Sequence, residues 1–231
     1  MKKLIIIASI LMLQCEKTTK NEECCLGPIK SNFVLGYATL DSVVFNVDYC
    51  NGAVDSVKNS IYDIRLVINY TAKEVFRYND TNTLYKNKFN MYARLYKDTS
   101  FNKPVDLCFK GTPCMLDTIT KIDVVCNRLY DDNHATGVSL GDIVKITYYC
   151  AADYINNYYT AQHDSLINLK TSTLQEFNKN YNYLIGIGAS SFLSFLSPPK
   201  ESGEYIFTLK IYIKDGRLFT YKLPILIESK I

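Results

Sequence analysis

The chain contains no tryptophan and only two histidines, His134 and His163. Without tryptophan it lacks the largest aromatic surface that can stack on a sugar, although tyrosine can also stack. Two histidines, with no Cys-x-x-Cys pair, do not suit a zinc site. The oxygen-bearing run Asp131-Asp132-Asn133 could hold Ca²⁺, but it lacks the ligand spacing of an EF-hand, and a solvated turn is the favoured interpretation. We expect no metal and no cofactor.

The chain also lacks the short motifs of common enzyme classes: G-x-S-x-G, H-E-x-x-H, the Walker phosphate loop and the protein-kinase set. Residues 186–190 (GIGAS) begin like a dinucleotide-binding fingerprint, but the final glycine and a surrounding βαβ unit are missing, so we interpret them as a glycine-rich bend. His134 and His163 lie in polar stretches, where exposed surface histidines are expected. We predict that the chain is not an enzyme.

No apolar run is long enough for a permanent membrane span. The run at residues 4–13 has ten residues, about half of the ~20 that a spanning helix needs. Lys2 and Lys3 precede this run and Cys15 follows it closely, which is typical of a signal peptide. The segment resembles bacterial lipoprotein signals, in which the chain is cut before a cysteine whose thiol carries a diacylglycerol. The alternative is an ordinary secretory signal, with Cys15 free to join a disulfide.

We therefore predict a lipoprotein signal peptide over residues 1–14, a lipidated Cys15 with a polar tether over 15–30, and a folded domain over 31–231. Two or three acyl chains would anchor the protein in the outer membrane, on the cell surface or the periplasmic face, since each buried CH₂ contributes ~0.8 kcal/mol. Removal of the two signal-peptide lysines lowers the net charge from +3 to +1. Such a balance does not favour nucleic acid as a partner.

Eight cysteines are present, and an exported chain meets an oxidising compartment in which disulfides are the default. If Cys15 is lipidated, the other seven allow at most three disulfides. Cys108 and Cys114 form the favoured pair, because Gly111 and Pro113 between them can turn the chain sharply. The remaining cysteines are either disulfide partners or small core residues: Cys24, Cys25, Cys50, Cys126 and Cys150.

The 19 tyrosines and 11 phenylalanines are typical of strands. Apolar residues alternate with a period of two over 33–50, 61–70 and 143–150, which predicts half-buried strands. The expected fold is mostly β, an antiparallel Ig-like β-sandwich with one or two short helices.

Residues 41–51 and 117–127 share an acid, a hydroxyl, an aliphatic residue and a final Cys-Asn at the same offsets. A duplication giving two Ig-like halves, with a boundary near 110–116, would produce this similarity. Chance in a strand-rich chain would also produce it, and we favour chance.

The C-terminal residues alternate on both sides of Asp215-Gly216, which predicts a β-hairpin. A two-residue turn would place Ile211 opposite Thr220 and would mix core with solvent. A three-residue loop over 214–216, with Gly216 in the left-handed region, instead places Ile211 opposite Phe219 and makes one face wholly apolar. Because a slip of one residue reverses every side chain, we predict the second register.

Two further segments have weaker patterns. Thr173 and Glu176 have the spacing of a capping box, so we predict a short helix over 173–182. Residues 79–90 are interpreted as a polar surface stretch, and the pattern at 91–96 fits a helix or a strand equally well.

A tyrosine- and asparagine-rich stretch at 151–163 holds the best candidates for binding. Such side chains can stack on sugars and bond to them, or can form a protein contact surface. The favoured interpretation is nevertheless that these tyrosines are partly buried at a sheet edge. The candidate binding residues are Tyr154, Asn156, Asn157, Tyr158, Tyr159 and Gln162.

Three stretches, DTITKIDVVCNRLYDDNHATG, TLQEFN and SPPKESGEYIFTLKIYIKDGRLF, look like an uncharacterised family of Bacteroidetes lipoproteins, defined as a domain of unknown function. The resemblance implies a sandwich-type β domain behind a lipidated cysteine and implies no catalytic residues. We expect a non-catalytic scaffold or accessory subunit that contacts an envelope protein. The alternative is a glycan-binding accessory lipoprotein.

Overall fold

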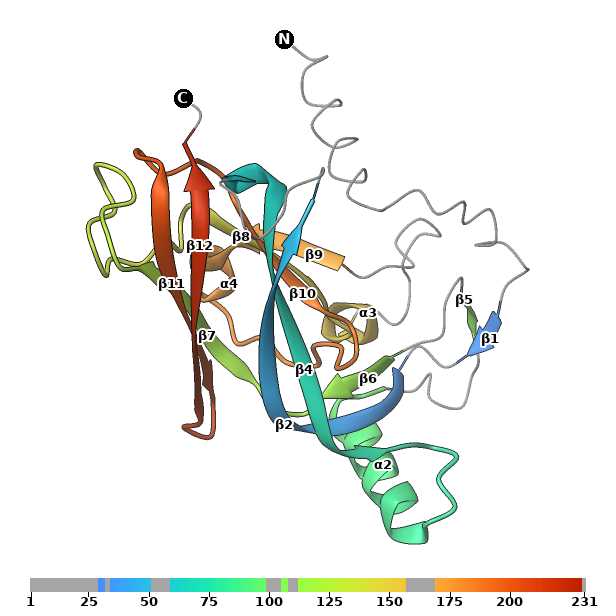
Figure 1. The fold of residues 1–231 in the computed structure, drawn as a ribbon. Coiled ribbons are helices and arrows are strands. Elements are labelled where there is room, and N and C mark those ends of the chain that lie inside the picture. Colours follow the sequence, from blue (N-terminus) through green and yellow to red (C-terminus); the bar gives the residue numbers. More distant parts are fainter. Residues whose placement is uncertain are drawn as a thin grey trace.

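The computed structural model describes residues 29–31, 34–50, 59–98, 105–107, 112–156 and 169–229. The predicted signal peptide, Cys15 and most of the predicted tether lie outside these residues. Within them the chain is mostly β, as predicted, with two main sheets (Figure 1). No helix in these ranges has both the length and the apolar character needed to cross a membrane.

The larger sheet has six strands in the order β6-β2-β4-β10-β8-β9. Every neighbouring pair is antiparallel except β2 and β6, which run parallel. The strands are β2 (Val34–Tyr49), β4 (Ile64–Phe76), β6 (Thr112–Met115), β8 (Val144–Tyr149), β9 (Leu169–Thr173) and β10 (Ser191–Phe195).

The second sheet has four strands in the order β3-β12-β11-β7, and only β3 and β12 run parallel. A separate two-stranded pairing joins β1 (Ile29–Ser31) to β5 (Val105–Leu107). The strands of the second sheet are β3 (Asn59–Ser60), β7 (Ile119–Cys126), β11 (Gly203–Ile213) and β12 (Leu218–Glu228).

The two main sheets face each other across one hydrophobic core. Phe45 on β2 lies 4.6 Å from Tyr221 on β12, measured between ring centroids, and Phe195 on β10 lies 5.0 Å from Phe207 on β11. Alternate residues of the long strands supply this core, because successive side chains of a strand point to opposite faces. The arrangement is consistent with a β-sandwich.

Each main sheet contains strands that precede residues 110–116 in the chain and strands that follow them. The described residues therefore do not divide there into two sheets with separate cores. The two similar stretches also occupy different sheets, with 41–49 in β2 and 119–126 in β7. Their leading acids differ as well, because Asp41 is exposed whereas Asp117 bonds to Arg217 and to the backbone of Leu40.

The predicted hairpin register is confirmed. Ile211 lies opposite Phe219, and the pairing continues in the same phase along β11 and β12. The amide of Ile213 donates to the carbonyl of Arg217 across a three-residue loop, and Gly216 has a φ of 95°. That conformation is accessible to glycine at little cost, which is why the loop closes at Asp215-Gly216.

Helix α2 (Thr83–Leu95) covers most of the predicted polar surface stretch and most of 91–96, which fitted a helix or a strand. The stretch lies at the surface, as predicted, but its helix was not predicted. Asn82 caps its first turn by accepting a bond from the amide of Leu84. Only Phe89 and Ala93, four residues apart, are buried, so an otherwise polar sequence conceals the helical period. Figure 1 shows α2 beyond the ends of β2 and β4, where the ring of Phe89 lies 5.4 Å from that of Tyr37.

The predicted capping box at Thr173 and Glu176 is present, but helix α4 spans only Leu174–Phe177 rather than 173–182. It ends there because the next residues bond to the edge of β7. The side-chain amide of Asn178 both accepts from and donates to the backbone of Ile122, at 2.8 Å in each case, and Asn182 pairs with Ile119. The other short helices are the 3₁₀ turn η1 (Ile61–Asp63) and α3 (Ala152–Asn156).

The predicted Cys108–Cys114 disulfide is corrected by the structure, because Cys114 is a free thiol, as are Cys126 and Cys150. Cys114 is fully buried in β6, which pairs with β2 on one side and bridges to Gly186 on the other. The chain therefore continues as a strand through Cys114, and the thiol fills the core as a small apolar group. Cys50 is a disulfide cysteine, and Cys108 lies outside the described residues.

Candidate functional site

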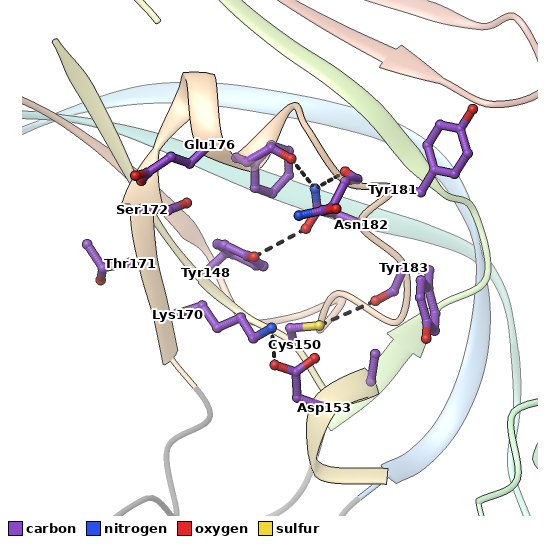
Figure 2. Close-up of a pocket in the computed structure, with 13 residues that line it drawn as sticks. Tyr148, Cys150, Asp153, Lys170, Thr171, Ser172, Glu176, Tyr181, Asn182 and Tyr183 are labelled. Carbon is purple, nitrogen blue, oxygen red and sulfur yellow. Dashed lines mark hydrogen bonds and ion pairs between the residues drawn. The ribbon is translucent and has the colours of Figure 1, made fainter. Parts of the chain in front are cut away.

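A polar pocket of ≈510 Å³ lies at the β9 edge of the six-stranded sheet (Figure 2). Its volume falls within the roughly 300–1,000 Å³ of small-ligand sites. The walls come from the ends of β8 and β9, from α3 and α4, and from the loop at 180–183. Two stretches of the chain, 148–153 and 170–183, therefore converge on it and place chemically different side chains around one space.

One wall is a fixed hydrogen-bonded unit. The ring of Tyr148 packs edge-on against Phe177 at 5.0 Å between centroids, and its hydroxyl donates to the side-chain oxygen of Asn182 at 3.2 Å. The amide nitrogen of Asn182 donates in turn to the carbonyls of Phe177 and Asn180, at 2.6 and 2.8 Å. With donor and acceptor ends both engaged, the Asn182 amide is held in one orientation.

Three charged side chains line the pocket, and two of them neutralise each other. The ammonium of Lys170 on β9 forms an ion pair with Asp153 on α3. The Glu176 carboxylate accepts the amide of Thr173 at 3.0 Å as part of the capping box. The net charge of the lining is therefore −1, which does not attract an anionic ligand.

The hydroxyl of Ser172 also lines this space, and it has no hydrogen-bond partner although its oxygen is buried. Only two other side-chain atoms within the described ranges share that condition, Thr39 Oγ1 and Arg65 Nε, and neither residue lines the pocket. A buried polar atom without a partner is costly, so native proteins rarely keep one without a reason. Ser172 thus places a hydroxyl that no protein group satisfies in the wall of the pocket.

Two groups of the pocket, the Tyr148 hydroxyl and the Cys150 thiol, have raised pKa values that favour their neutral forms. Burial raises the pKa of the Tyr148 hydroxyl, with smaller contributions from Cys150 and Asp153, so it remains a neutral donor and acceptor. Burial likewise raises the pKa of the Cys150 thiol, which contacts the carbonyl of Tyr183 at 3.4 Å. Because the thiolate rather than the thiol is nucleophilic, this environment does not activate Cys150 for covalent chemistry.

His134 does not line this pocket, and the prediction that it is an exposed surface histidine is wrong. Its side chain is buried, with Nδ1 2.6 Å from Asp131 and Nε2 2.9 Å from Asp142. Burial works to lower the pKa of His134, but the hydrogen bonds to Asp142 and Asp131 outweigh it and raise the pKa above its usual 6.5. His134 therefore joins two parts of the loop between β7 and β8.

The possible Ca²⁺ ligands in this loop are engaged elsewhere. Asp131 also accepts the backbone amides of Asn133 and His134, and Asp132 pairs with Lys200. In the part of the chain that the structure describes, no group of three or more His, Cys, Asp or Glu side chains is placed to hold a metal ion. The loop is a hydrogen-bonded turn.

The structure places two of the six predicted binding residues, Tyr154 and Asn156, both in α3 beside the pocket. The Asn156 amide donates to the hydroxyl of Tyr183 at 3.2 Å, so Asn156 contacts a residue that lines the pocket. The other candidates and related residues lie outside the described ranges: Asn157, Tyr158, Tyr159, Gln162, His163, Cys108 and Cys15.

The sequence prediction missed Tyr148, Ser172 and Asn182. Tyr148 belongs to an apolar strand, and nothing in its period-two pattern marks it as part of a pocket. A usable signal did exist at residues 180–183, which read Asn-Tyr-Asn-Tyr and share the composition that marked the 151–163 stretch.

The fold and the pocket together define a mostly β protein of two facing sheets with a polar, tyrosine-lined site at one sheet edge. Comparison of the chain with protein-family models, with curated proteins and with solved structures finds no match.

Proposed function

We propose that this protein is a non-catalytic accessory lipoprotein of the bacterial cell envelope that binds a glycan in the pocket beside β8 and β9. The observation that carries the proposal is the unpartnered Ser172 hydroxyl, which is presented among fixed tyrosine and asparagine side chains. Lipidation of Cys15 would tether the protein to the outer membrane, on the cell surface or the periplasmic face. Two sheets of mainly antiparallel strands over one core support an Ig-like arrangement for the domain.

The chemistry of the lining supports a sugar as the ligand. Sugar hydroxyls are both donors and acceptors, and so are the Tyr, Ser and Asn groups of this pocket. Tyrosine rings also offer apolar faces for the C–H face of a sugar ring. A neutral sugar suits a pocket whose lining carries a net charge of −1 better than a phosphate or a carboxylate does.

The proposed lipid anchor at Cys15 can be tested directly. Metabolic labelling with an alkyne fatty acid is expected to mark the protein and to leave Cys15→Ala unlabelled. Label that persists in Cys15→Ala would overturn the anchor.

A role through protein contacts is the second candidate, and a surface of α2 favours it. Leu84, Met91 and Leu95 are 60, 53 and 66% exposed, and spacings of seven and four residues place them on one helical face. This exposed helical face could contact an envelope protein. Crosslinking and pull-down from native envelopes tests the role, because a specific partner should be captured by the natural chain and lost in Leu95→Lys.

Replacing Ser172 by alanine is expected to weaken glycan binding about fivefold without lowering stability, since one hydrogen bond contributes about 1 kcal/mol. Removing a buried hydroxyl that has no partner leaves no native bond broken. The measurement is binding to an array of defined oligosaccharides, followed by titration calorimetry and thermal melting.

Thr39→Val is the matched control, because Thr39 also carries a buried hydroxyl without a partner but lies on β2, away from the pocket. It should bind as the natural chain does. If Ser172→Ala binds the glycan as tightly as the natural chain does, Ser172 is not part of the binding site. If no oligosaccharide on the array binds at millimolar sensitivity, glycan binding itself is refuted.

A further inference from the structure

A second, smaller pocket adjoins the first. Its volume is ≈240 Å³, and it lies between the C-terminal end of α2, helix α3 and the segment at 183–184. Ala152 and Tyr183 line both pockets, so the two spaces share a wall. The smaller volume falls below the roughly 300 Å³ at which independent small-ligand sites begin, which suits an extension of the larger site.

The shared wall is held in place from the side of the second pocket. The ring of Tyr183 stacks with that of Tyr96 at 6.0 Å between centroids and an interplanar angle of 18°. The side-chain amide of Asn156 donates to the Tyr183 hydroxyl at 3.2 Å. An aromatic ring fixed at both its face and its hydroxyl is a preorganised contact for a sugar ring.

Two residues that line the second pocket have an unusual backbone conformation. Within the described residues, only two non-glycine residues have a positive φ, Lys97 at 56° and Leu184 at 54°, and both line this second pocket. Lys97 follows the end of α2, where a left-handed residue is a common helix terminator. Leu184 has no such role, and the left-handed region is costly for any residue with a Cβ, so this is a strained conformation of the kind often found at ligand-binding sites.

The lining of the second pocket differs from that of the first. Leu95, Ile155 and Leu184 contribute aliphatic surface, while Asn156 and Lys97 supply the polar groups. A ring with one apolar face and a few hydroxyls matches this mixture. The first pocket, which is lined by Tyr148, Ser172 and Asn182, suits a neighbouring unit of the same ligand.

We propose that the second pocket is a further subsite of the same binding site, so that the ligand is a linear oligosaccharide of at least two units that passes Tyr183. The inference rests on the proposed function and deepens it, because it specifies a chain rather than a single sugar. Asn156 is a specificity-determining residue that selects the longer ligand.

The test uses linear glucose, mannose, galactose and N-acetylglucosamine series of one to six units, with affinities measured by titration calorimetry. Disaccharides of the preferred series are expected to bind at least tenfold more tightly than the monosaccharide. Asn156→Ala should weaken disaccharide binding about fivefold and monosaccharide binding by less, because only the longer ligand contacts the second pocket, whereas Tyr183, which Asn156 holds, borders both.

Asn87→Ala is the control, since Asn87 is an exposed asparagine on α2 that lines neither pocket. It should bind every length as the natural chain does, and equal melting temperatures would show that both variants fold. The second subsite would be overturned if the natural chain bound the monosaccharide and the disaccharide with equal affinity. It would also be overturned if Asn87→Ala changed the affinity for any length. An Asn156→Ala loss that is equal for one and two units, or no loss for either, would also overturn it. If no oligosaccharide of any series or length binds, the proposed glycan-binding function fails together with the second subsite.

Discussion

Replacing Asp117 by alanine is expected to lower the free energy of unfolding by about 3 kcal/mol, because it removes a charged partner from a partly buried cross-link. Asp117 Oδ2 accepts the backbone amide of Leu40 at 2.6 Å, and Asp117 Oδ1 pairs with the guanidinium of Arg217. Arg217 also donates to the Leu40 carbonyl at 2.9 Å and to Asp215 at 2.8 Å. Both backbone groups of Leu40 therefore depend on this ion pair.

Leu40 needs these partners because the pairing of β2 with β4 is irregular there. The register shifts on both sides of Leu40, which is the mark of a β-bulge. A bulge leaves backbone groups outside the regular ladder, and such groups must find other partners when buried. Asp117, in the turn between β6 and β7, and Arg217, in the loop between β11 and β12, supply them and so join the two sheets at one end.

Urea denaturation of Asp117→Ala and the natural chain measures the effect. Asp41→Ala is the matched control, since Asp41 begins the similar stretch at 41–51 but is exposed, and its loss should change stability little. Arg217→Ala should cost a similar amount, and the double variant should cost less than the sum of the two because the residues share one network. Equal midpoints for Asp117→Ala and Asp41→Ala would show that the cross-link contributes nothing.

Local patterns predicted the features that depend on local chemistry. The hairpin register followed from the period of two together with a glycine at the loop, because only one register sets the alternate buried residues of β11 opposite the inward-facing apolar residues of β12. The capping box at Thr173 was visible for the same reason, since both partners lie within four residues. Helix α2 was missed because its burial depends on Phe89 meeting Tyr37, a contact between distant parts of the chain.

The candidate site was less predictable than the fold. Residue composition drew attention to 151–163, and Asn156 does lie beside Tyr183. The principal pocket, however, is formed where β8, β9 and α4 meet, and no sequence spacing relates Tyr148 to Ser172 or Asn182. The same applies to His134, whose polar surroundings in sequence indicated exposure although two aspartates enclose it in the fold.

Replacing His134 by glutamine is expected to lower the free energy of unfolding by about 2 kcal/mol near pH 5.5, because hydrogen bonds between charged partners are among the stronger ones. The size of this loss should depend on pH. The pKa of His134 is raised, so its contribution is complete below 6.5 and is lost as the pH rises through its folded value. The bonds from Asn133 and His134 outweigh burial and lower the pKa of Asp131 below 3.8, so its contribution is complete above 3.8 and is lost as the pH falls through its folded value.

The difference between His134→Gln and the natural chain should therefore be widest from about pH 4 to pH 6.5 and should narrow at higher pH, where the natural histidine loses its proton. Urea denaturation at several pH values between 5 and 9 measures it. Asp132→Asn is the control, because it alters a carboxylate of the same loop that meets Lys200 in solvent, and its curve should run parallel to that of the natural chain. If the His134→Gln curve also runs parallel, the histidine is not charged between the two aspartates, and the loop is held by neutral hydrogen bonds alone.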